Sequence, residues 1–402
     1  MDDLRQTVID AYRRHFDTEP TVVVRAPGRV NLLGAHVDYS EGWVLPAAID
    51  RAVWLAAGPD DDGRLDVVSL DFDERRTLDL GALPPPVPER SADGSGAHWS
   101  DLPGGMAWAL DEAGHRPPGL RGVFTSDVPM GAGVSSSAAV EMAFVLAFER
   151  LSDGAWGLDG AGLPGADLAR LGQRVENGYL GLGSGIMDQF ASIHGRRDHA
   201  FILDCRDLSF RQLPLPADAA VLVADSGVRR RLSASGFNDR RGQCEEAVTV
   251  LRAHLPGIRT LRDVSETQLE LHAHRLPLEL RRRSQHAVAE CRRVRDGADA
   301  LDRGDLGAFG QLMRQSHASS RDLYEVSIPE LDTLAAAAWS SDGCWGARMS
   351  GGGFGGCVTA LVHRDALDTV RGTMIDAFDV EYGRRPTLFD CAVSDGASVH
   401  SP

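Results

Sequence analysis

The sequence predicts a two-domain protein of the α+β or α/β class. Its 402 residues suggest two domains, because a typical domain has about 100–200 residues. Apolar residues make up 43% of the chain, enough to bury a sizeable core. Patterns typical of helices and of strands occur in both halves. We expect the break near residue 205, where one predicted strand ends and a new segment begins.

The expected elements follow in order along the chain. The first half is predicted to contain helices over residues 3–16 (with Asp2 as N-cap), 135–151 and 166–180, and strands over 21–24 and 199–203. The second half is predicted to contain a strand over 219–224, a glycine-rich loop leading into a strand over 343–362, and helices over 240–254, 285–301, 305–324, 329–339 and 366–378.

None of the 42 basic residues is a lysine, whereas an average composition would give on the order of 20 lysines. A codon bias towards arginine is the simple explanation, but the absence still excludes mechanisms. P-loop NTPases and protein kinases need a lysine on the nucleotide phosphates. Pyridoxal enzymes and Schiff-base aldolases need a lysine amine. If this protein handles phosphate, it must use backbone amides, helix dipoles, arginine and metal.

The formal net charge of -16 argues against nucleic acid as a partner, because phosphate neutralisation needs a basic face. The acidic, polar start does not resemble a secretory signal, and no apolar run approaches the roughly 18 residues of a membrane helix. The six cysteines form no CxxC pair, so reduced thiols are expected. These observations predict a cytoplasmic protein.

A turn after the first strand concentrates polar groups that could face a ligand. Arg29, His36 and Asp38 lie in it, although a structural capped turn would give the same pattern. A second glycine-rich stretch, residues 349–357, has five glycines in six positions. Such a run is costly in backbone entropy unless a ligand or another backbone segment approaches closely, so both a structural turn and a ligand loop remain open.

Residues 129–139 predict an anion-binding loop that needs no lysine. Gly131 and Gly133 permit a tight turn, and Ser135, Ser136 and Ser137 then open a strongly helical pattern. The free amides and the positive dipole end at the start of such a helix point towards an anion. A phosphate group is therefore a candidate ligand.

Two acids, Glu176 and Asp188, follow this helix in the sequence. Glu176 lies late in a predicted helix, and Asp188 lies among Ile186, Met187 and Phe190, where we expect it to be shielded from water. Each acid is either a hydrogen-bonded structural group or a base or metal ligand.

Together these stretches resemble the galactokinase branch of the GHMP small-molecule kinases. The matching motifs, in order, are GRVNLLGAHVDY, PMGAGVSSSAA, GIMDQF and MSGGGFGGC. The resemblance implies an α+β fold of two domains, here residues 1–205 and 206–402, each with a mixed sheet and helices and with the active site in the cleft between them. It also implies a role in carbohydrate metabolism: phosphorylation of a sugar at its anomeric hydroxyl, with ATP and Mg²⁺, by a monomer or weak homodimer.

The same resemblance assigns roles to residues of this chain. Asp188 matches the catalytic aspartate that faces the C1 hydroxyl, as base or as electrostatic support, and Arg29 matches the arginine that neutralises charge near the transferred phosphate. Ser137 and Glu176 match the Mg²⁺ ligands. The residues that match the ATP phosphate loop are Gly131, Gly133, Ser135 and Ser136.

The sugar-facing residues are also implied by the resemblance. His36 and Asp38 match residues that read the sugar hydroxyls, and Gly185 matches a position beside the sugar. A carboxylate such as Asp38 can accept two hydroxyl protons at once, which suits the neighbouring hydroxyls of a galacto-configured sugar. Trp99 corresponds to a nucleotide-stacking tryptophan, with core packing as the alternative.

Ala35 and Phe237 depart from the family pattern. Galactokinases usually carry glutamate at the first position, which accepts a hydrogen bond from the sugar 6-hydroxyl, and tyrosine at the second. Losing such a charged hydrogen bond costs about 1.5–3 kcal/mol. The predicted substrate is galactose or a close relative, and the alternative is galacturonate or another C6 variant. An arginine of residues 229–231 could pair with a substrate carboxylate, or the run could be solvated surface.

A non-catalytic sugar sensor of the same fold is the alternative from another class. Such paralogues lack residues of the phosphate loop after its serines, whereas residues 137–139 are complete here and both Asp188 and Arg29 are present. A GHMP kinase for a non-sugar alcohol is disfavoured by Asp38 and by the GIMDQF stretch. The sequence therefore favours an active sugar 1-kinase.

Overall fold

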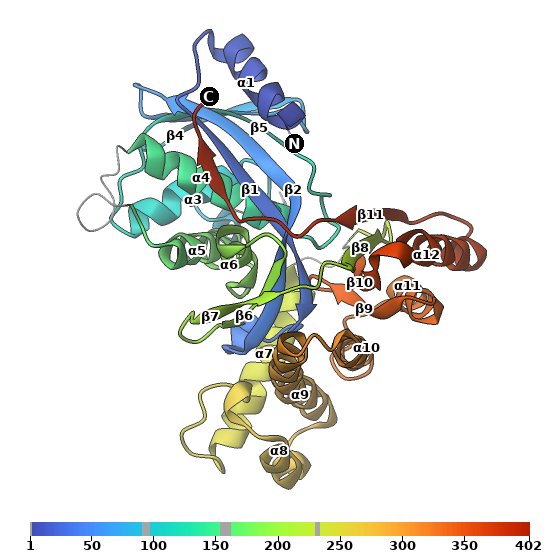
Figure 1. Cartoon of the computed structure of the whole chain (residues 1–402). Coiled ribbons are helices and arrows are strands. Elements are labelled where there is room, and N and C mark those ends of the chain that lie inside the picture. Colours follow the sequence, from blue (N-terminus) through green and yellow to red (C-terminus); the bar gives the residue numbers. More distant parts are fainter. Residues whose placement is uncertain (1, 91–96, 153–161, 230–233) are drawn as a thin grey trace.

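The computed structural model describes residues 2–90, 97–152, 162–229 and 234–402, which build the expected mixture of helices and sheets (Figure 1). The helices are α1 (Asp2–Phe16), α2 (Val87–Arg90), α3 (Asp101–Glu112), α4 (Ser136–Leu151), α5 (Gly165–Arg174), α6 (Met187–His194), α7 (Ala234–Arg252), α8 (Glu266–His272), α9 (Leu278–Asp302), α10 (Leu306–Asp322), α11 (Pro329–Ser340) and α12 (Leu367–Tyr382). The short helical turns are η1 (Asp38–Ser40), the π-turn η4 (Val175–Tyr179), η5 (Leu261–Asp263), η6 (Ala273–Arg275) and η7 (Arg364–Ala366). The strands are β1 (Val22–Leu33), β2 (Trp43–Pro59), β3 (Arg64–Ser69), β4 (Glu74–Asp79), β5 (Leu120–Ser126), β6 (His199–Asp204), β7 (Phe210–Pro214), β8 (Ala219–Asp225), β9 (Cys344–Ser350), β10 (Cys357–His363), β11 (Thr387–Cys391) and β12 (Ser398–His400).

The larger sheet is built around β1 and β2. Its strand order within the described residues is β12-β1-β2-β5-β3-β4, with β6 paired to β2 and β7 to β6. Successive β1 side chains point to opposite faces, so Val22 and Val24 pack with α3 and α4, whereas Val23 packs with α1. Every β1 residue is therefore buried, and the strand delivers the polar turn at its end into the interior.

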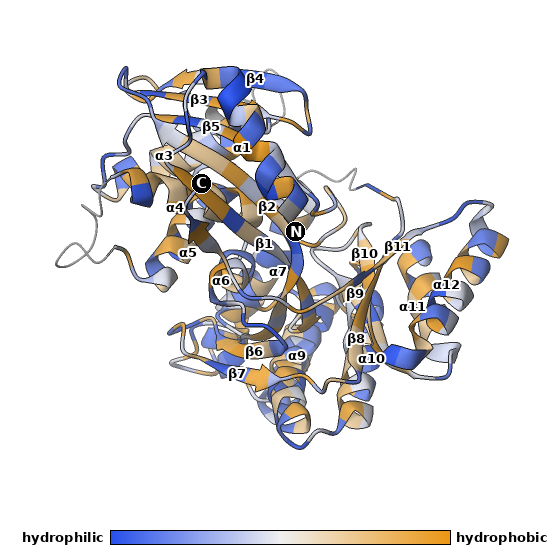
Figure 2. Cartoon of the chain, turned by 45° about the horizontal axis from the view of Figure 1, so that its top comes forward, coloured by the Kyte–Doolittle hydropathy of each residue, from blue (hydrophilic) through white to orange (hydrophobic). Residues whose placement is uncertain are grey.

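The smaller sheet is antiparallel, with the order β11-β8-β10-β9. Its β8 strand is buried along its whole length, and Figure 2 shows it as hydrophobic, whereas the edge strand β4 is hydrophilic. Helix α11 packs on β9 and β10, α12 on β8, and α10 on β9. These helices lie at the red and brown end of the colour scale in Figure 1.

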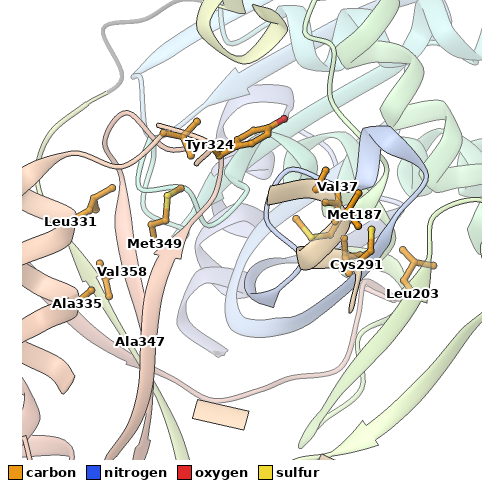
Figure 3. Packing of buried hydrophobic residues seen from close by; sticks show 14 of the residues in the cluster. Val37, Met187, Leu203, Cys291, Tyr324, Leu331, Ala335, Ala347, Met349 and Val358 are labelled. Carbon is orange, nitrogen blue, oxygen red and sulfur yellow. The ribbon is translucent and has the colours of Figure 1, made fainter. Parts of the chain in front are cut away.

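Both sequence halves contribute to shared structure. The largest buried cluster combines Val37 and Met187 from the first half with Met349 and Val358 from the second (Figure 3). Strands β7 and β12 come from the predicted second domain but pair within the larger sheet. The boundary near residue 205 remains a prediction, and the halves are joined by more than a linker.

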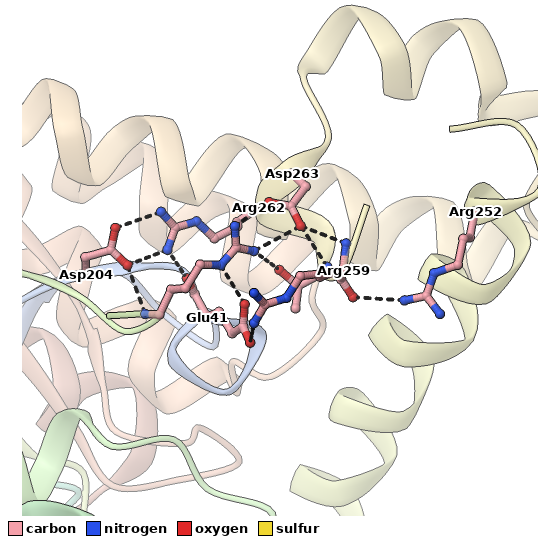
Figure 4. Close-up of polar contacts among 8 residues, drawn as sticks. Glu41, Asp204, Arg252, Arg259, Arg262 and Asp263 are labelled. Atoms are coloured by element: carbon pink, nitrogen blue, oxygen red, sulfur yellow. Dashed lines mark hydrogen bonds and ion pairs between the residues drawn. The ribbon is translucent and has the colours of Figure 1, made fainter. Parts of the chain in front are cut away.

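An arginine–carboxylate network ties the turn after β1 to η5 (Figure 4). Glu41 accepts a hydrogen bond from Arg206, 2.6 Å away, and Arg206 also pairs with Asp263 at 2.7 Å. Arg262 donates to the Glu41 carbonyl at 2.6 Å and to Asp204 at 2.7 Å. The turn that carries the predicted sugar residues is therefore anchored to the second half of the chain.

The predicted helices at 3–16, 135–151, 305–324, 329–339 and 366–378 are confirmed within a few residues. The predicted helix at 166–180 ends at Arg174 and continues as the π-turn η4. The expected loop at the start of 343–362 was wrong, because β9 precedes the glycines. The sequence prediction also missed β2, β3 and β5, since buried strands lack the alternation that marks a half-exposed one. It missed β4 as well, an edge strand that is mostly exposed.

None of the six cysteines forms a disulfide in the structure, and five of them are buried. Across residues 2–90, 97–152, 162–229 and 234–402, no helix combines the length and apolarity needed to cross a membrane.

Two helical glycines provide a test of the packing between α10 and β9. A Cβ added to Gly310 would overlap the Trp345 carbonyl group, whereas one added to Gly372 on α12 would meet no atom within 4 Å. We expect Gly310→Ala to lower the free energy of unfolding by about 2–3 kcal/mol through overpacking. The control Gly372→Ala should raise it by about 0.5–1 kcal/mol, because alanine favours the helix. Urea denaturation measures both, and equal effects would contradict the packing.

Candidate active site

One cavity of about 450 Å³ lies where the turn after β1, the start of α4, α6, α7 and the loop between β9 and β10 meet. Its size is typical of a small-molecule site. The predicted site residues that line it are Arg29, His36, Asp38, Gly131, Gly133, Ser135, Ser136, Ser137, Glu176, Gly185, Asp188 and Phe237. Residues as far apart in the sequence as Arg29 and Phe237 thus need no further movement to share one ligand.

Arg29 and Asp188 form a bidentate ion pair at the floor of this cavity. The Arg29 Nε donates to Asp188 Oδ1 at 2.8 Å and its Nη2 donates to Oδ2 at 2.7 Å. The third nitrogen, Nη1, donates to the Gly133 carbonyl at 2.7 Å, and the Ser135 hydroxyl donates to Asp188. This fork geometry fixes direction as well as distance. One side chain therefore positions both the acid and the loop before α4.

The loop before α4 presents backbone amides to the cavity. Gly131, Gly133 and Ser135 all have positive φ, at 70°, 81° and 62°. This conformation turns the chain sharply into α4, whose first amides have no partner within the helix. A Cβ on Gly133 would lie 2.8 Å from the Ser350 carbonyl oxygen, so the loop before α4 packs directly on the loop after β9. The result is a helix start with the geometry that can bind an anion.

Glu176 faces Ser137 across the cavity. The Ser137 Oγ lies 3.4 Å from Glu176 Oε1, and the Ser184 hydroxyl donates to the other carboxylate oxygen. Glu176 lies on the π-turn η4, a distortion often found at functional sites. Burial, together with the nearby Asp188, raises the pKa of Glu176 to about 7. A bound cation would favour its ionised form, and carboxylate and hydroxyl oxygens suit Mg²⁺.

The turn after β1 places His36 and Asp38 on the opposite wall. Burial and the proximity of Asp188 raise the pKa of Asp38 to about 6. Gly185 packs so closely on the Asp38 carboxylate that any side chain there would overlap it. The His36 Nδ1 lies 3.1 Å from the Tyr39 hydroxyl, and the Phe237 ring centroid lies 5.2 Å from that of His36. The wall therefore combines a carboxylate, an imidazole and an apolar ring.

Two predicted site residues do not line the cavity. Ala35 belongs to the turn but is only 2% exposed and does not line the cavity. Trp99 donates from Nε1 to Glu74 at 2.7 Å, and its ring stacks on Phe72 at a centroid distance of 6.2 Å. Its place in the structure agrees with the packing alternative, and nucleotide stacking by Trp99 remains a prediction.

The arginine run at 229–231 lies partly outside the described residues, since only Arg229 is described. Arg229 lines the cavity and pairs with Asp225 at 2.8 Å. It lies alongside Gly131, on the phosphate-loop side of the cavity.

Four lining residues were not proposed as site residues from the sequence: Asn31, Leu182, Ser184 and Met187. Gly351, Gly352 and Phe354 also line the cavity, and they belong to the 349–357 stretch for which a ligand loop was one alternative. Asn31 is a polar residue inside a strand that is buried along its whole length, a signal that could have identified it. The backbone N–H of Asn31 donates to the Ser350 hydroxyl at 3.2 Å, and its backbone carbonyl accepts from Arg348 at 2.7 Å. The glycine loop after β9 is thus both a structural turn and part of the cavity wall.

Comparison with known proteins agrees with this arrangement. The galactokinase galactose-binding signature matches residues 10–59, the GHMP kinases N-terminal domain matches 101–196, and the GHMP kinases C-terminal model matches 298–379. A crystal structure of mevalonate kinase shares the fold, with a TM-score of 0.60 at 17% identity over 93% of this chain and 99% of that one. The fold and the cavity are those of a GHMP kinase, a class of ATP-dependent phosphotransferases.

Full-length relatives narrow the class. The galactokinase of Roseiflexus sp. (strain RS-1) is 44% identical over 96% of this chain and 95% of its own, and that of Chloroflexus aurantiacus is 41% identical over 98% and 97%. The Lactococcus lactis galactokinase, solved in complex with galactose, has a TM-score of 0.88 at 30% identity, covering 97% of this chain and 98% of that one. The chain belongs to the galactokinase family.

The raised pKa of Asp38 predicts a pH-dependent stability. Aspartate ionises near 3.8 in the unfolded chain, whereas Asp38 ionises near 6 in the folded one. Between these values the unfolded state releases its proton first, so the free energy of unfolding falls as pH rises from about 4 to about 6. Asp38→Asn removes this loss and should stabilise the ligand-free protein by about 1–3 kcal/mol at pH 7.5, and by little at pH 4.

Urea denaturation at both pH values measures this effect. Asp368→Asn, which changes a fully exposed side chain, should match the wild type at each pH. A destabilised Asp38→Asn variant at pH 7.5 would contradict the stability cost assigned to the ionised, buried Asp38 carboxylate.

Proposed function

We propose that the protein transfers the γ-phosphoryl group of ATP to the anomeric hydroxyl of galactose, giving ADP and galactose 1-phosphate. One observation carries this proposal. A single cavity brings together the Arg29–Asp188 pair, the start of α4 and the wall that contains Asp38. The galactose-binding signature spans Arg29, His36 and Asp38, which supports galactose as the sugar.

The triphosphate of ATP would bind at the start of α4. Amides of Gly131, Gly133, Ser135 and Ser136 and the positive end of the helix provide a lysine-free phosphate cradle. Ser137 and Glu176 would hold Mg²⁺, and the bound ion would neutralise charge on the β- and γ-phosphates. One hydroxyl and one carboxylate make an incomplete shell, which suits an ion that also takes phosphate oxygens and water as ligands.

Asp188 would receive the C1 hydroxyl of the sugar. The hydroxyl oxygen forms the new bond to the γ-phosphorus while the bond from that phosphorus to the β–γ bridging oxygen breaks, and the hydroxyl proton passes to Asp188 or is held by it. Arg29 stays paired with Asp188 and adds positive charge where the transferred group gains negative charge. Positioning and charge stabilisation are the main contributions in such a transfer.

The wall formed by His36, Asp38, Gly185 and Phe237 would orient the sugar. Two features favour a second candidate substrate with a changed C6 group, such as galacturonate: Ala35 offers no carboxylate, and the Phe237 ring lacks a hydroxyl. The pairing of Arg229 with Asp225, beside the phosphate loop, gives no support to it as the partner of a substrate carboxylate. Galactose therefore remains the first candidate.

We also infer a cytoplasmic location and a monomer or weak homodimer. The thiols form no disulfide and are mostly buried, which suits a reducing compartment.

Replacing Asp188 tests the assignment of the acid. Asp188→Asn should lower turnover by about 10²- to 10⁴-fold and leave ATP binding nearly unchanged, because the phosphates would be held by backbone amides and not by this carboxylate. Coupled detection of ADP release measures turnover, and calorimetry measures ATP binding. Asp302→Asn is the matched control, because Asp302 also forms a bidentate pair with an arginine, Arg211, but on the surface. Substantial turnover by Asp188→Asn would reject the assigned role.

A substrate panel decides the C6 group. With Mg-ATP, galactose should give the highest kcat/KM, and galacturonate, L-arabinose and a 6-deoxygalactose should be turned over more slowly. A higher kcat/KM on galacturonate would replace galactose by the second candidate. Inactivity on every galacto-configured sugar would reject the proposed function.

A further inference from the structure

Two buried side chains on α9 hold the turn after β1 from behind. Glu290 and His286 lie one helical turn apart, and both are fully buried. The Glu290 Oε1 accepts hydrogen bonds from the backbone amides of Gly34 and Ala35, at 2.9 and 3.0 Å. The His286 Nε2 lies 2.9 Å from the Ala35 carbonyl oxygen. Successive peptide groups of the turn are thus held at their N–H and C=O sides by one helix.

The protonation state of His286 follows from its neighbours. Burial lowers the pKa of His286 to about 4, so the ring is neutral near pH 7. A carbonyl only accepts, so the Nε2 facing Ala35 must carry the proton. The Nδ1 then accepts from the Ser319 hydroxyl, 2.9 Å away. The Ala35 carbonyl therefore fixes the tautomer, and the Ser319 hydroxyl satisfies the other ring nitrogen.

The charge of Glu290 is also set by its neighbours. Burial favours the neutral acid, but Arg293 and Arg348 hold the pKa of Glu290 well below its usual range. Arg293 donates to Oε2 at 2.6 Å, and the Ser316 hydroxyl donates to Oε1 at 2.6 Å. Ser316 and Ser319 both lie on α10, so one neighbouring helix supports both members of the pair.

The turn needs such support because its backbone is unusual. Gly34 has a φ of 98° and His36 a φ of 57°, and a residue with a side chain in this left-handed region costs about 1–2 kcal/mol. The same conformation sends His36 and Asp38 into the cavity, whereas Glu290 and His286 do not line it. The groups that fix the turn are therefore separate from those that would touch a sugar.

We propose that Glu290 and His286 are positioning residues for sugar binding, and that they act by fixing the backbone of the turn that carries His36 and Asp38. This inference rests on the proposed function, since it takes the sugar to bind at that turn. It predicts that loosening the pair weakens sugar binding more than ATP binding, because Glu290 and His286 bond the turn after β1 and not the phosphate cradle.

Substitutions of His286 separate its two nitrogens. In His286→Gln the side-chain amide nitrogen can take the place of Nε2 and still donate to Ala35, whereas in His286→Asn the shorter side chain reaches only the place of Nδ1. We expect His286→Asn to raise the KM for galactose about 5- to 10-fold, the effect of one lost hydrogen bond, with the KM for ATP changed less than about twofold. His286→Gln should recover most of the loss.

A milder variant guards against a folding failure. Ser319→Ala leaves the imidazole in place but removes the hydrogen bond at its Nδ1. It should raise the KM for galactose about 2- to 5-fold. Its matched control is Ser320→Ala, because Ser320 is a buried neighbour on α10 whose hydroxyl donates to the Ser316 carbonyl. That control should leave both KM values unchanged.

Hydrogen exchange of peptides covering residues 33–41, measured without ligand, tests the positioning independently of the substrate. Exchange should be faster in His286→Asn and Ser319→Ala than in the wild type, His286→Gln and Ser320→Ala. Unchanged exchange, or parallel rises in both KM values, would overturn the inference. A wild-type enzyme inactive on galactose would instead reject the proposed function, and the exchange data would still decide whether the pair fixes the turn.

Discussion

The ion pair between Arg29 and Asp188 is the contact on which the geometry of the cavity depends. It joins a buried strand of the larger sheet to the start of α6, and the remaining guanidinium nitrogen fixes the loop before α4. Three segments distant in the sequence are thereby held in one orientation by a rigid planar group. A lysine could not do this, since its ammonium is a point charge without a fixed fork. The lysine-free composition is compatible with phosphate chemistry because backbone amides and one arginine supply the positive potential.

The cavity also concentrates negative charge. Asp38, Glu176 and Asp188 face the same space, and the pKa values of Asp38 and Glu176 are raised by burial and by Asp188. In the ligand-free protein this crowding opposes folding. A sugar that donates hydroxyl hydrogens to Asp38, and a cation at Glu176, would both relieve it. The arrangement thus favours binding at the expense of stability, a trade-off common at functional sites.

The motifs in the sequence were sufficient to predict most of the cavity, because its key residues lie in short, unusual stretches: polar side chains beside glycines. The buried strands were harder, since β2 reads as two apolar runs, separated by Asp50 and Arg51, without a periodicity. The roles of Glu290 and His286 were not predictable, because a carboxylate and an imidazole within a helix give no sign of which distant backbone they reach. Trp99 was an ambiguous case, and its bond to Glu74 depends on a strand pairing absent from the local pattern.

The return of the chain to its first sheet has a consequence for synthesis on the ribosome. Strand β12 pairs with β1, matching Val23 with His400 and Arg25 with Ser398, and Arg5 of α1 donates to the Ser401 carbonyl at 2.7 Å. During translation the outer edge of β1 therefore stays unpaired until residues 398–400 have been synthesised. An uncovered edge strand is a template for wrong pairing, and domains emerging from the ribosome fold in N-to-C order. The nascent larger sheet thus remains open on one side until residues 398–400 have been made.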